Sequence, residues 1–305
     1  MKRAVVIGCG GTIGGAWTIA ALHALQQQTG WDVRDADILQ GTSAGAELGT
    51  MLGGGASVDD LVAMQRDTAT DTRLIRHLAA TPPSLPPLPW PRPLNPLLLL
   101  SQRGLAAVSG MAPTGRGDAQ WLQQLADGFA DASGWLPHRG IRMVAFDYQR
   151  GERVPFGAPG APAATVGEAL RASWAIPGWM PPVQIGDRRF IDGGAASTAS
   201  VDLIGPEEAD EIFVVPPMAS APGVRAPGWG GRVEHTLLRG PMSTGLDAEL
   251  AAVRARGTHV TVIRPDRSDL AGLGPHFMRR SRRRAAFESA MITAPDTVRR
   301  ALEAA

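Results

Sequence analysis

Cysteine is almost absent from this chain, since Cys9 is the single cysteine among 305 residues. One cysteine cannot form an intramolecular disulfide, so a small disulfide-stapled fold is excluded and the chain suits a reducing cytoplasm. The sequence also lacks any run of about 18 uninterrupted apolar residues, which would be needed for a transmembrane helix. Met1-Lys2-Arg3 precedes an apolar run that ends at Ile7, too short for the hydrophobic region of a signal peptide. We therefore expect a cytoplasmic protein with at most transient contact to a membrane surface.

An excess of charge of either sign is also missing. Lys and Arg total 30 and Asp and Glu total 29, so the formal net charge is +1. This balance gives no reason to expect a nucleic-acid partner. Hydrophobic residues make up 44% and charged residues 19%, which is typical of a globular protein with a substantial core. Oligomeric state is not encoded in any of these features.

Short apolar runs alternate with helical patterns along the chain. Runs of this kind are typical of buried parallel strands, with the helices covering both faces of the sheet. We therefore expect an α/β protein, a three-layer α/β/α sandwich around a mostly parallel central sheet, with residues 1–305 as a single domain. The predicted strands are 4–7, 37–40, 141–146, 153–156, 188–191, 211–215 and 259–263. The predicted helices are 14–28, 46–52, 58–78, 118–132, 165–174, 246–256, 279–291 and a short one at 295–305.

Proline is concentrated in one stretch, with eight prolines in the sixteen residues Thr81 to Pro96. Proline has no amide donor and blocks helix interiors, so this stretch is predicted to be extended or irregular. The apolar run Leu97 to Leu100 follows it directly. We interpret residues 79–117 as an insertion over one edge of the domain, forming a cap or lid. The alternative is an ordered surface loop with no gating role.

The pentapeptide Gly41-Thr42-Ser43-Ala44-Gly45 lies between a predicted strand and a predicted helix. In the pattern G-x-S-x-G, such a turn exposes the serine as a nucleophile, and its small neighbours let the chain double back. The helix N-terminus behind it favours negative charge. Ser43 is thus a candidate nucleophile, and the alternative is an ordinary glycine-rich turn.

The glycine-rich segment Gly8 to Gly15 also joins a predicted strand to a predicted helix. A dinucleotide fingerprint, G-x-G-x-x-G, fails because its sixth position is Ile13. Gly-Gly-Thr-Ile-Gly resembles the N-terminal motif of asparaginases. Thr70-Asp71-Thr72 weakly resembles the second motif of that family. The third interpretation is an oxyanion hole, since glycines let backbone amides approach an anion closely.

Asp192-Gly193-Gly194 follows a predicted strand and by itself is most often a simple turn. A serine nucleophile needs a base to take its proton, and a Ser–Asp dyad needs no histidine. No histidine lies in a comparable strand-end turn, and we interpret His23, His138, His235, His259 and His276 as structural or surface residues.

These blocks together resemble the patatin-like phospholipases. That family has a glycine-rich oxyanion turn, then G-T-S-A-G, then A-S-x-A-x-P-x-x-x-P-P running into D-G-G. The chain has Gly10-Gly11, then residues 41–45, then 172–182 with the sequence ASWAIPGWMPP, then Asp192-Gly193-Gly194. The later residues 214–218 and 248–266 also resemble the bacterial, especially actinobacterial, branch. The resemblance covers most of the chain.

The resemblance implies a serine acyl hydrolase that cleaves lipid or other acyl esters through an acyl-enzyme, without metal or cofactor. Ser43 would be the nucleophile, Asp192 its base, and the amides of Gly10 and Gly11 the oxyanion hole. Supporting turns would be formed by Gly8, Gly14, Gly41, Gly45, Gly193 and Gly194. Acyl transfer or thioester cleavage would use the same groups, and a non-catalytic binding protein on the same fold is a further alternative.

Two departures from the family pattern stand out. Many patatins have an arginine or lysine two residues after the last oxyanion glycine, where this chain has Ile13. The proline-rich stretch at 81–96 matches no family motif. Residues 97–100 and 174–180 could line an acyl pocket or belong to the core. Because a carboxylate of ordinary pKa is a weak base for a serine hydroxyl, we also predict that Asp192 is partly buried beside Ser43.

Overall fold

The computed structural model describes residues 1–80, 85–102 and 104–305. In that part of the chain an eight-stranded sheet has the order β10-β9-β1-β2-β5-β8-β7, and β6 pairs with β5. The five strands from β10 to β5 are parallel, whereas β6 and β8 run antiparallel to β5 and β7 antiparallel to β8. The strands are β1 (Arg3–Ile7), β2 (Ile38–Thr42), β5 (Ile141–Asp147), β6 (Glu152–Phe156), β7 (Val183–Ile185), β8 (Arg188–Asp192), β9 (Glu211–Val215) and β10 (His259–Val262). The expected mostly parallel α/β sheet is confirmed.

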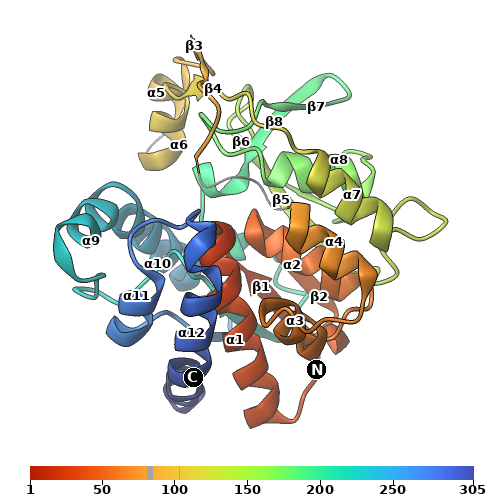
Figure 1. Ribbon diagram of the computed structural model, residues 1–305. Coiled ribbons are helices and arrows are strands. Elements are labelled where there is room, and N and C mark those ends of the chain that lie inside the picture. The colour runs from red at the N-terminus through yellow and green to blue at the C-terminus, as the bar shows by residue number, and fades with distance from the viewer. Residues whose placement is uncertain (81–84, 103) are drawn as a thin grey trace.

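Helices cover both faces of this sheet, because alternate side chains of the central strands point to opposite sides. Val5 and Ile7 of β1 belong to one core cluster with α1, α2 and α12, while Ala4 and Val6 pack with α10 on the other face. Figure 1 shows α1 and α12 side by side in front of the sheet. The main helices are α1 (Gly11–Thr29), α2 (Ala44–Gly53), α3 (Val58–Gln65), α4 (Thr72–Ala80), α7 (Gln120–Phe129), α8 (Val166–Ser173), α9 (Gly228–Glu234), α10 (Gly240–Arg254), α11 (Arg267–Leu273) and α12 (Arg283–Glu303).

The single helix predicted over 58–78 is wrong, because the structure divides it into α3 and α4. Asp67 has a left-handed backbone with φ 60°, which interrupts a right-handed helix. Asp71 then accepts a hydrogen bond from the amide of Arg73 at 2.8 Å, a local bond that competes with helix continuation. Polar turn residues therefore outweigh the helical pattern between the two helices.

The C-terminal helices predicted at 279–291 and 295–305 are in fact one helix, α12, which runs through Pro295. A proline inside a helix removes one backbone hydrogen bond and is unfavourable in isolation. Here α12 packs along α1, and Gln28 donates a hydrogen bond to the Pro295 carbonyl at 2.8 Å. Tertiary packing thus stabilises a helix that the local sequence would end.

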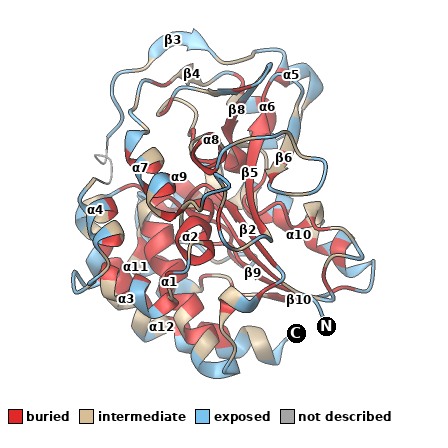
Figure 2. Cartoon of the chain, turned by 90° about the vertical axis from the view of Figure 1, so that its right-hand side faces the viewer, coloured by how far each residue is buried: buried red, intermediate tan, exposed pale blue. Residues whose placement is uncertain are grey.

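The segment between α4 and α7 forms short elements at one end of the molecule. They are β3 (Trp90–Pro93), α5 (Leu98–Ser101), α6 (Gly104–Ser109) and β4 (Pro113–Thr114), and β3 pairs with β4. Figures 1 and 2, which view the molecule from two sides, both place these elements at the top of the molecule. We call residues 85–102 and 104–117 the cap. Residues 81–84 of the proline-rich stretch lie outside the described residues.

Candidate active site

Ser43 lies in the sharp turn between β2 and α2, with φ 57° and ψ −120°. A residue other than glycine in this region is strained, and such strain is typical of functional turns. Both glycines of the pentapeptide are required by close backbone contacts. A Cβ atom on Gly41 would lie 2.3 Å from the Gly45 carbonyl oxygen, and one on Gly45 would lie 2.1 Å from the Ile7 carbonyl oxygen. The predicted strand–turn–helix elbow is therefore present.

Asp192 reaches Ser43 because β2 and β8 share one edge of β5. Thr42 pairs with Val144, and Asp192 pairs with Ala145, the next residue of β5, while β6 occupies the opposite edge. Since β2 runs parallel and β8 antiparallel to β5, their carboxyl ends meet head to head. The register thus places the residue after β2 and the last residue of β8 together, close enough for the Ser43 side chain to lower the pKa of the Asp192 carboxyl group.

The Asp192 carboxylate is only 4% exposed and accepts a hydrogen bond from the Gly194 amide at 2.7 Å. Burial raises the pKa of Asp192 to about 7, and the hydrogen bonds from Ser43 and Gly194 oppose this rise. Burial has this effect because it disfavours the charged form of a carboxyl group. Asp192 is therefore a stronger base than an exposed aspartate, and it lies beside Ser43 as the sequence predicts.

The glycine turn between β1 and α1 presents backbone amides beside these two side chains. The amides of Cys9 and Ile13 are bonded to the carbonyls of Thr198 at 2.8 Å and Phe277 at 2.9 Å. For the amides of Gly10 and Gly11, in contrast, no acceptor is found among the residues that the structure describes. Two unbonded amides at a helix N-terminus can bind an anion.

These groups meet at one cavity of about 550 Å³. Gly10, Gly11, Ser43 and Asp192 all line it, and its other walls are mainly apolar. The apolar lining residues include Leu105, Val108, Met111, Ile176, Trp179, Met218, Leu238, Met242 and Phe277. A cavity of this size with few, grouped polar atoms is typical of a small-molecule site.

The residues that line the cavity show which of the two predicted apolar segments, 97–100 or 174–180, lies near the site. Ile176, Pro177 and Trp179 line the cavity, as the 174–180 segment allowed. Leu97 to Leu100 do not belong to the lining, and three of these four leucines are exposed on α5. The leucine run therefore does not form part of the cavity wall. Only Leu98 of the run is buried in the core.

Ser173, the last residue of α8, holds the backbone of the Ser43 turn through hydrogen bonds. Its hydroxyl accepts a hydrogen bond from the Ser43 amide at 2.9 Å and donates one to the Val144 carbonyl at 2.6 Å. Ser173 is completely buried, so no water can replace these bonds. The sequence showed Ser173 only as part of the ASWAIPGWMPP block and gave it no role. Two adjacent small residues before an apolar stretch were the only signal.

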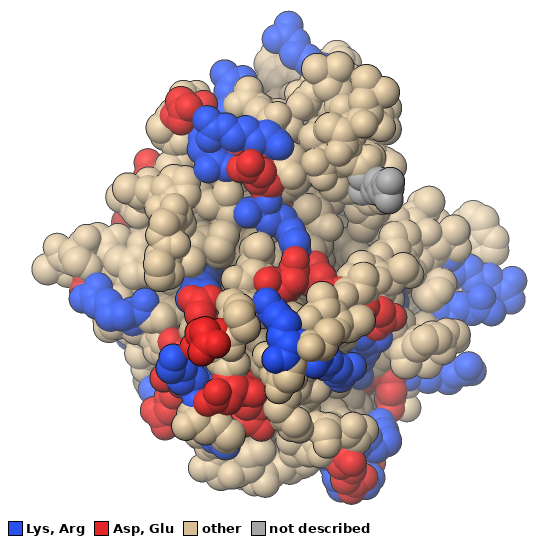
Figure 3. Space-filling view, turned by 180° about the vertical axis from the view of Figure 1, so that it is seen from behind, with Lys and Arg blue, Asp and Glu red and all other residues tan. Residues whose placement is uncertain are grey.

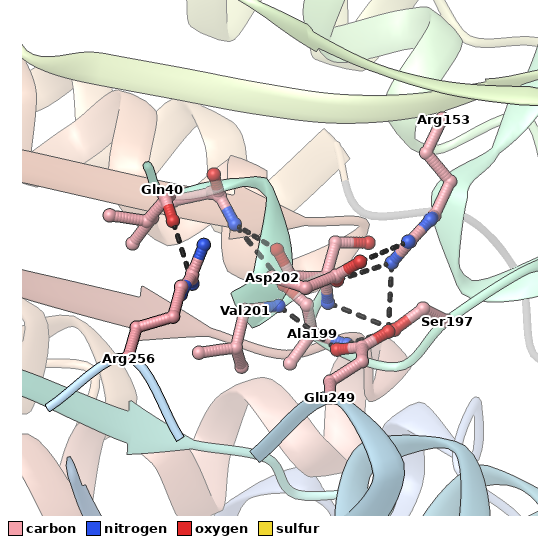
Figure 4. A network of polar contacts seen from close by, with 10 residues as sticks. Gln40, Arg153, Ser197, Ala199, Val201, Asp202, Glu249 and Arg256 are labelled. Carbon is pink, nitrogen blue, oxygen red and sulfur yellow. Dashed lines mark hydrogen bonds and ion pairs between the residues drawn. The ribbon is translucent and has the colours of Figure 1, made fainter. Parts of the chain in front are cut away.

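A polar network supports the segment that follows Asp192 (Figure 4). Arg153 of β6 donates to Asp202 at 2.6 and 2.9 Å and to Glu249 of α10 at 2.8 Å, and Glu249 accepts from the Val201 amide at 3.0 Å. Gln40 of β2 donates to the Ser200 carbonyl at 2.8 Å. Burial raises the pKa of Glu249, and the neighbouring Asp202 raises it further. The network connects the loop after Asp192 to β2, the strand that ends directly before Ser43.

The remaining predicted glycines also lie at close contacts around the site. A Cβ on Gly8 would lie 3.0 Å from the Thr198 carbonyl oxygen, and one on Gly193 would lie 2.6 Å from the Val144 carbonyl oxygen. A Cβ on Gly14 would lie 3.2 Å from the Pro217 side chain. Ile13, at the position where many patatins have a cation, has its side chain in the core.

Groups that could compete with Ser43 are placed unfavourably. Cys9 lines the cavity, but burial, followed by the Asp192 carboxylate, raises the pKa of its thiol to about 12, so it is protonated at neutral pH. Thr12 is not part of the cavity lining, and Asp71 is bonded to Arg73, so the asparaginase-like motifs do not meet in the cavity.

Histidine is likewise not found among the described residues that line the cavity. His23 faces Asp59 at 3.3 Å, and Nε2 of His138 lies 2.8 Å from the Ala36 carbonyl oxygen. His77, which the sequence analysis did not consider, is buried with its Nε2 2.8 Å from Glu47 Oε1. These three histidines therefore bind neighbouring groups away from the cavity.

Comparison with known proteins identifies the family of this chain. The sequence model of one family, described as patatin-like phospholipase, matches residues 5–203. The chain belongs to the patatin-like phospholipase family. The match includes the glycine turn, the Ser43 elbow, the Ser173 block and Asp192, and it ends before β9 and β10. Membership implies a serine lipid acyl hydrolase with a patatin-like α/β fold.

Among solved structures, the chain is similar to the crystal structure of VipD from Legionella pneumophila. The identity is 13%, the TM-score is 0.43, and the alignment covers 99% of this chain and 67% of that one. No curated protein matches the sequence. In the described part of this chain, no helix combines the length and the apolar character needed to cross a lipid bilayer.

Proposed function

We propose that this protein cleaves acyl esters with Ser43 as nucleophile, Asp192 as general base and the amides of Gly10 and Gly11 as oxyanion hole. One observation carries the proposal. The mainly apolar cavity of about 550 Å³ brings together Ser43, Asp192, Gly10 and Gly11, the groups that this chemistry needs. Family membership supports the same reaction class.

In the first half-reaction, Asp192 accepts the proton of the Ser43 hydroxyl while Ser43 Oγ bonds to the acyl carbonyl carbon. The carbonyl oxygen becomes negative and accepts hydrogen bonds from Gly10 and Gly11. A single donor of this kind is worth roughly 2.7–4 kcal/mol in the transition state. The ester bond then breaks, the leaving alcohol takes the proton from Asp192, and the acyl group stays on Ser43.

In the second half-reaction, Asp192 accepts a proton from water, whose oxygen attacks the acyl-enzyme. The same two amides stabilise the oxyanion, and the carboxylic acid leaves as Ser43 regains its proton. An alcohol or amine in place of water would give acyl transfer, and a thioester would form the same acyl-enzyme. The apolar cavity walls favour a fatty acyl chain over a small polar acyl group.

Ser173 is proposed as a positioning residue. Its hydroxyl holds the Ser43 amide, so it fixes the strained backbone without touching the substrate. The resemblance to the actinobacterial branch and the role of the cap as a lid stay predictions.

The experiment is hydrolysis of p-nitrophenyl esters of increasing acyl length by wild type, Ser43→Ala and Asp192→Asn. We expect kcat/KM to fall by about 10⁴-fold in Ser43→Ala and by at least about 10³-fold in Asp192→Asn, because residues that act as a unit each abolish most of the rate. A fluorophosphonate should label wild type at Ser43.

Matched controls are Ser268→Ala and Asp187→Asn, which change exposed side chains away from the cavity. Both should keep wild-type rates. Wild-type protein that is inert on every ester and unlabelled by the fluorophosphonate would favour a non-catalytic binding protein. Ester release that requires an added alcohol would favour an acyltransferase.

A further inference from the structure

The cap exposes an unusual share of the apolar surface. Among the described residues, thirteen large hydrophobic side chains are exposed, and eight of them belong to the cap. These eight are Leu85, Leu88, Trp90, Leu97, Leu99, Leu100, Val108 and Met111. Scattered single apolar residues are normal on a surface, whereas a concentration in one segment indicates an interaction site.

This apolar surface is continuous with the proposed active site. Val108 and Met111 are exposed and also line the cavity, so the cavity reaches the surface beneath the cap. The cavity is also lined by Leu238 and Met242. Leu237, the chain neighbour of Leu238, and Trp229 of α9 are exposed. We call residues 219–240 the α9 segment. Exposed apolar residues therefore occur in both of the segments that supply Val108, Met111 and Leu238 to the cavity lining.

The exposed charges of these two segments are of one sign. Residues 85–117 contain arginine but no aspartate or glutamate. Arg92 and Arg116 are exposed, and the Arg116 guanidinium lies 4.5 Å from the centre of the Trp90 ring. From behind, in Figure 3, the upper right of the molecule is largely uncharged, and acidic residues gather lower down and to the left.

The α9 segment repeats this pattern. Arg225 and Arg232 are exposed, and its single acidic residue, Glu234, is buried in an ion pair with Arg239 at 2.9 Å. A surface that combines exposed leucine and tryptophan with arginine, and lacks exposed acid, complements an anionic lipid headgroup layer above an acyl interior. A protein partner would gain nothing from continuity with an acyl cavity.

We propose that the cap and the α9 segment dock on an anionic lipid surface, with the cavity mouth facing the lipid. This inference rests on the proposed function, because it names the physical form in which the substrate reaches Ser43. The apolar side chains enter the acyl boundary, the arginines contact anionic headgroups, and a lipid acyl chain passes from the layer into the cavity without crossing water.

The test is cosedimentation with vesicles of phosphatidylcholine and phosphatidylglycerol in a 4:1 ratio, compared with pure phosphatidylcholine. Every protein carries Ser43→Ala, so that hydrolysis cannot alter the vesicles. The triple variant Leu88→Ser/Trp90→Ser/Leu100→Ser should bind at least about tenfold more weakly, since each of these side chains is exposed and none lines the cavity. Arg92→Gln/Arg116→Gln should lose about tenfold in binding to the anionic vesicles only.

Matched controls are Ile292→Ser, which changes an 80% exposed apolar residue on α12, and Arg299→Gln on the same helix. Both should bind as the parent does, and all variants should keep the parent's thermal unfolding midpoint. The proposal is overturned by a parent that does not bind either vesicle, or by a triple variant that binds equally well. Cap-dependent dimerisation without vesicle binding, seen by light scattering, would also overturn it.

The docking proposal and the proposed function can fail separately. If the protein binds vesicles but its form with Ser43 intact hydrolyses no ester, the docking proposal stands and the proposed esterase function is rejected. Hydrolysis of soluble p-nitrophenyl butyrate without any vesicle binding would retain the esterase and reject the docking surface. If both proposals are correct, the triple variant with Ser43 intact should hydrolyse the soluble ester at the wild-type rate.

Discussion

The floor of the cavity and the cap above it use small and apolar residues for opposite purposes. On the floor, glycines permit backbone segments from β1, β2 and β8 to approach within a distance that a Cβ atom would prevent, and Ser43 and Asp192 are buried there. In the cap, leucine and tryptophan side chains are left exposed. The floor is therefore determined by contacts inside the molecule, whereas the cap composition is explained by what lies outside it.

The largest effect that would test this comparison is expected at Gly45. Gly45→Ala places a methyl group 2.1 Å from the Ile7 carbonyl oxygen, and both segments are backbone that cannot move separately. We expect a loss of more than about 4 kcal/mol in the free energy of unfolding, or no soluble protein. Chemical denaturation measures this change in the free energy of unfolding.

Gly15→Ala is the matched control, because a Cβ there meets only Ala44 Cβ at 3.8 Å. It should unfold within about 1 kcal/mol of wild type, since alanine is the better helix former. Equal stability of the two variants would show that the floor tolerates expansion and that the contrast with the cap is unfounded.

The next effect concerns the charge of Asp192. Its folded-state pKa of about 7 lies above the ordinary value of 3.8, so between these pH values the folded protein keeps a proton that the unfolded chain has lost. Stability should therefore fall as pH rises through this window and level off above pH 7. Three pKa units correspond to about 4 kcal/mol.

Asp192→Asn removes this dependence, so its stability advantage over wild type should be small at pH 4 and largest at pH 8, measured by urea denaturation. Wild-type kcat/KM should rise with an apparent pKa near 7, because the base must be deprotonated. Asp187→Asn, an exposed site, should unfold with the wild-type pH dependence. An identical pH dependence of unfolding in Asp192→Asn would contradict the raised pKa.

The smallest effect is expected for Ser173→Ala, which leaves the Ser43 amide and the Val144 carbonyl without their partner. We expect kcat to fall about 10- to 100-fold with KM within about twofold, since the substrate does not touch Ser173 and a lost buried hydrogen bond costs about 1–3 kcal/mol. Ser173→Thr, which keeps the hydroxyl, should recover part of kcat. A change in KM alone would indicate that Ser173 shapes the cavity instead.

Local patterns predicted most of the fold correctly. The strands β1, β2, β5, β6, β8, β9 and β10 were expected within one or two residues, because buried strands are short apolar runs ended by turn residues. The capping box of Thr165 and Glu168 was read correctly as the start of α8. The errors came where tertiary contacts outweighed local preference, as in α12, or where a left-handed residue such as Asp67 carried no sequence signal.

The sequence by itself determined which reactive groups are available in the cavity, because a serine, an aspartate and paired glycines occur at strand-end turns, and a Cβ atom would not fit at Gly41 or Gly45. Only the tertiary structure decided which of these turns meet. The register of β2 and β8 on one edge of β5 joins Ser43 to Asp192. That register depends on pairings between residues 102 positions apart for β2 with β5, and 43 to 47 positions apart for β5 with β8. Burial, and with it the raised pKa of Asp192, follows from the same packing and cannot be read from the turn alone.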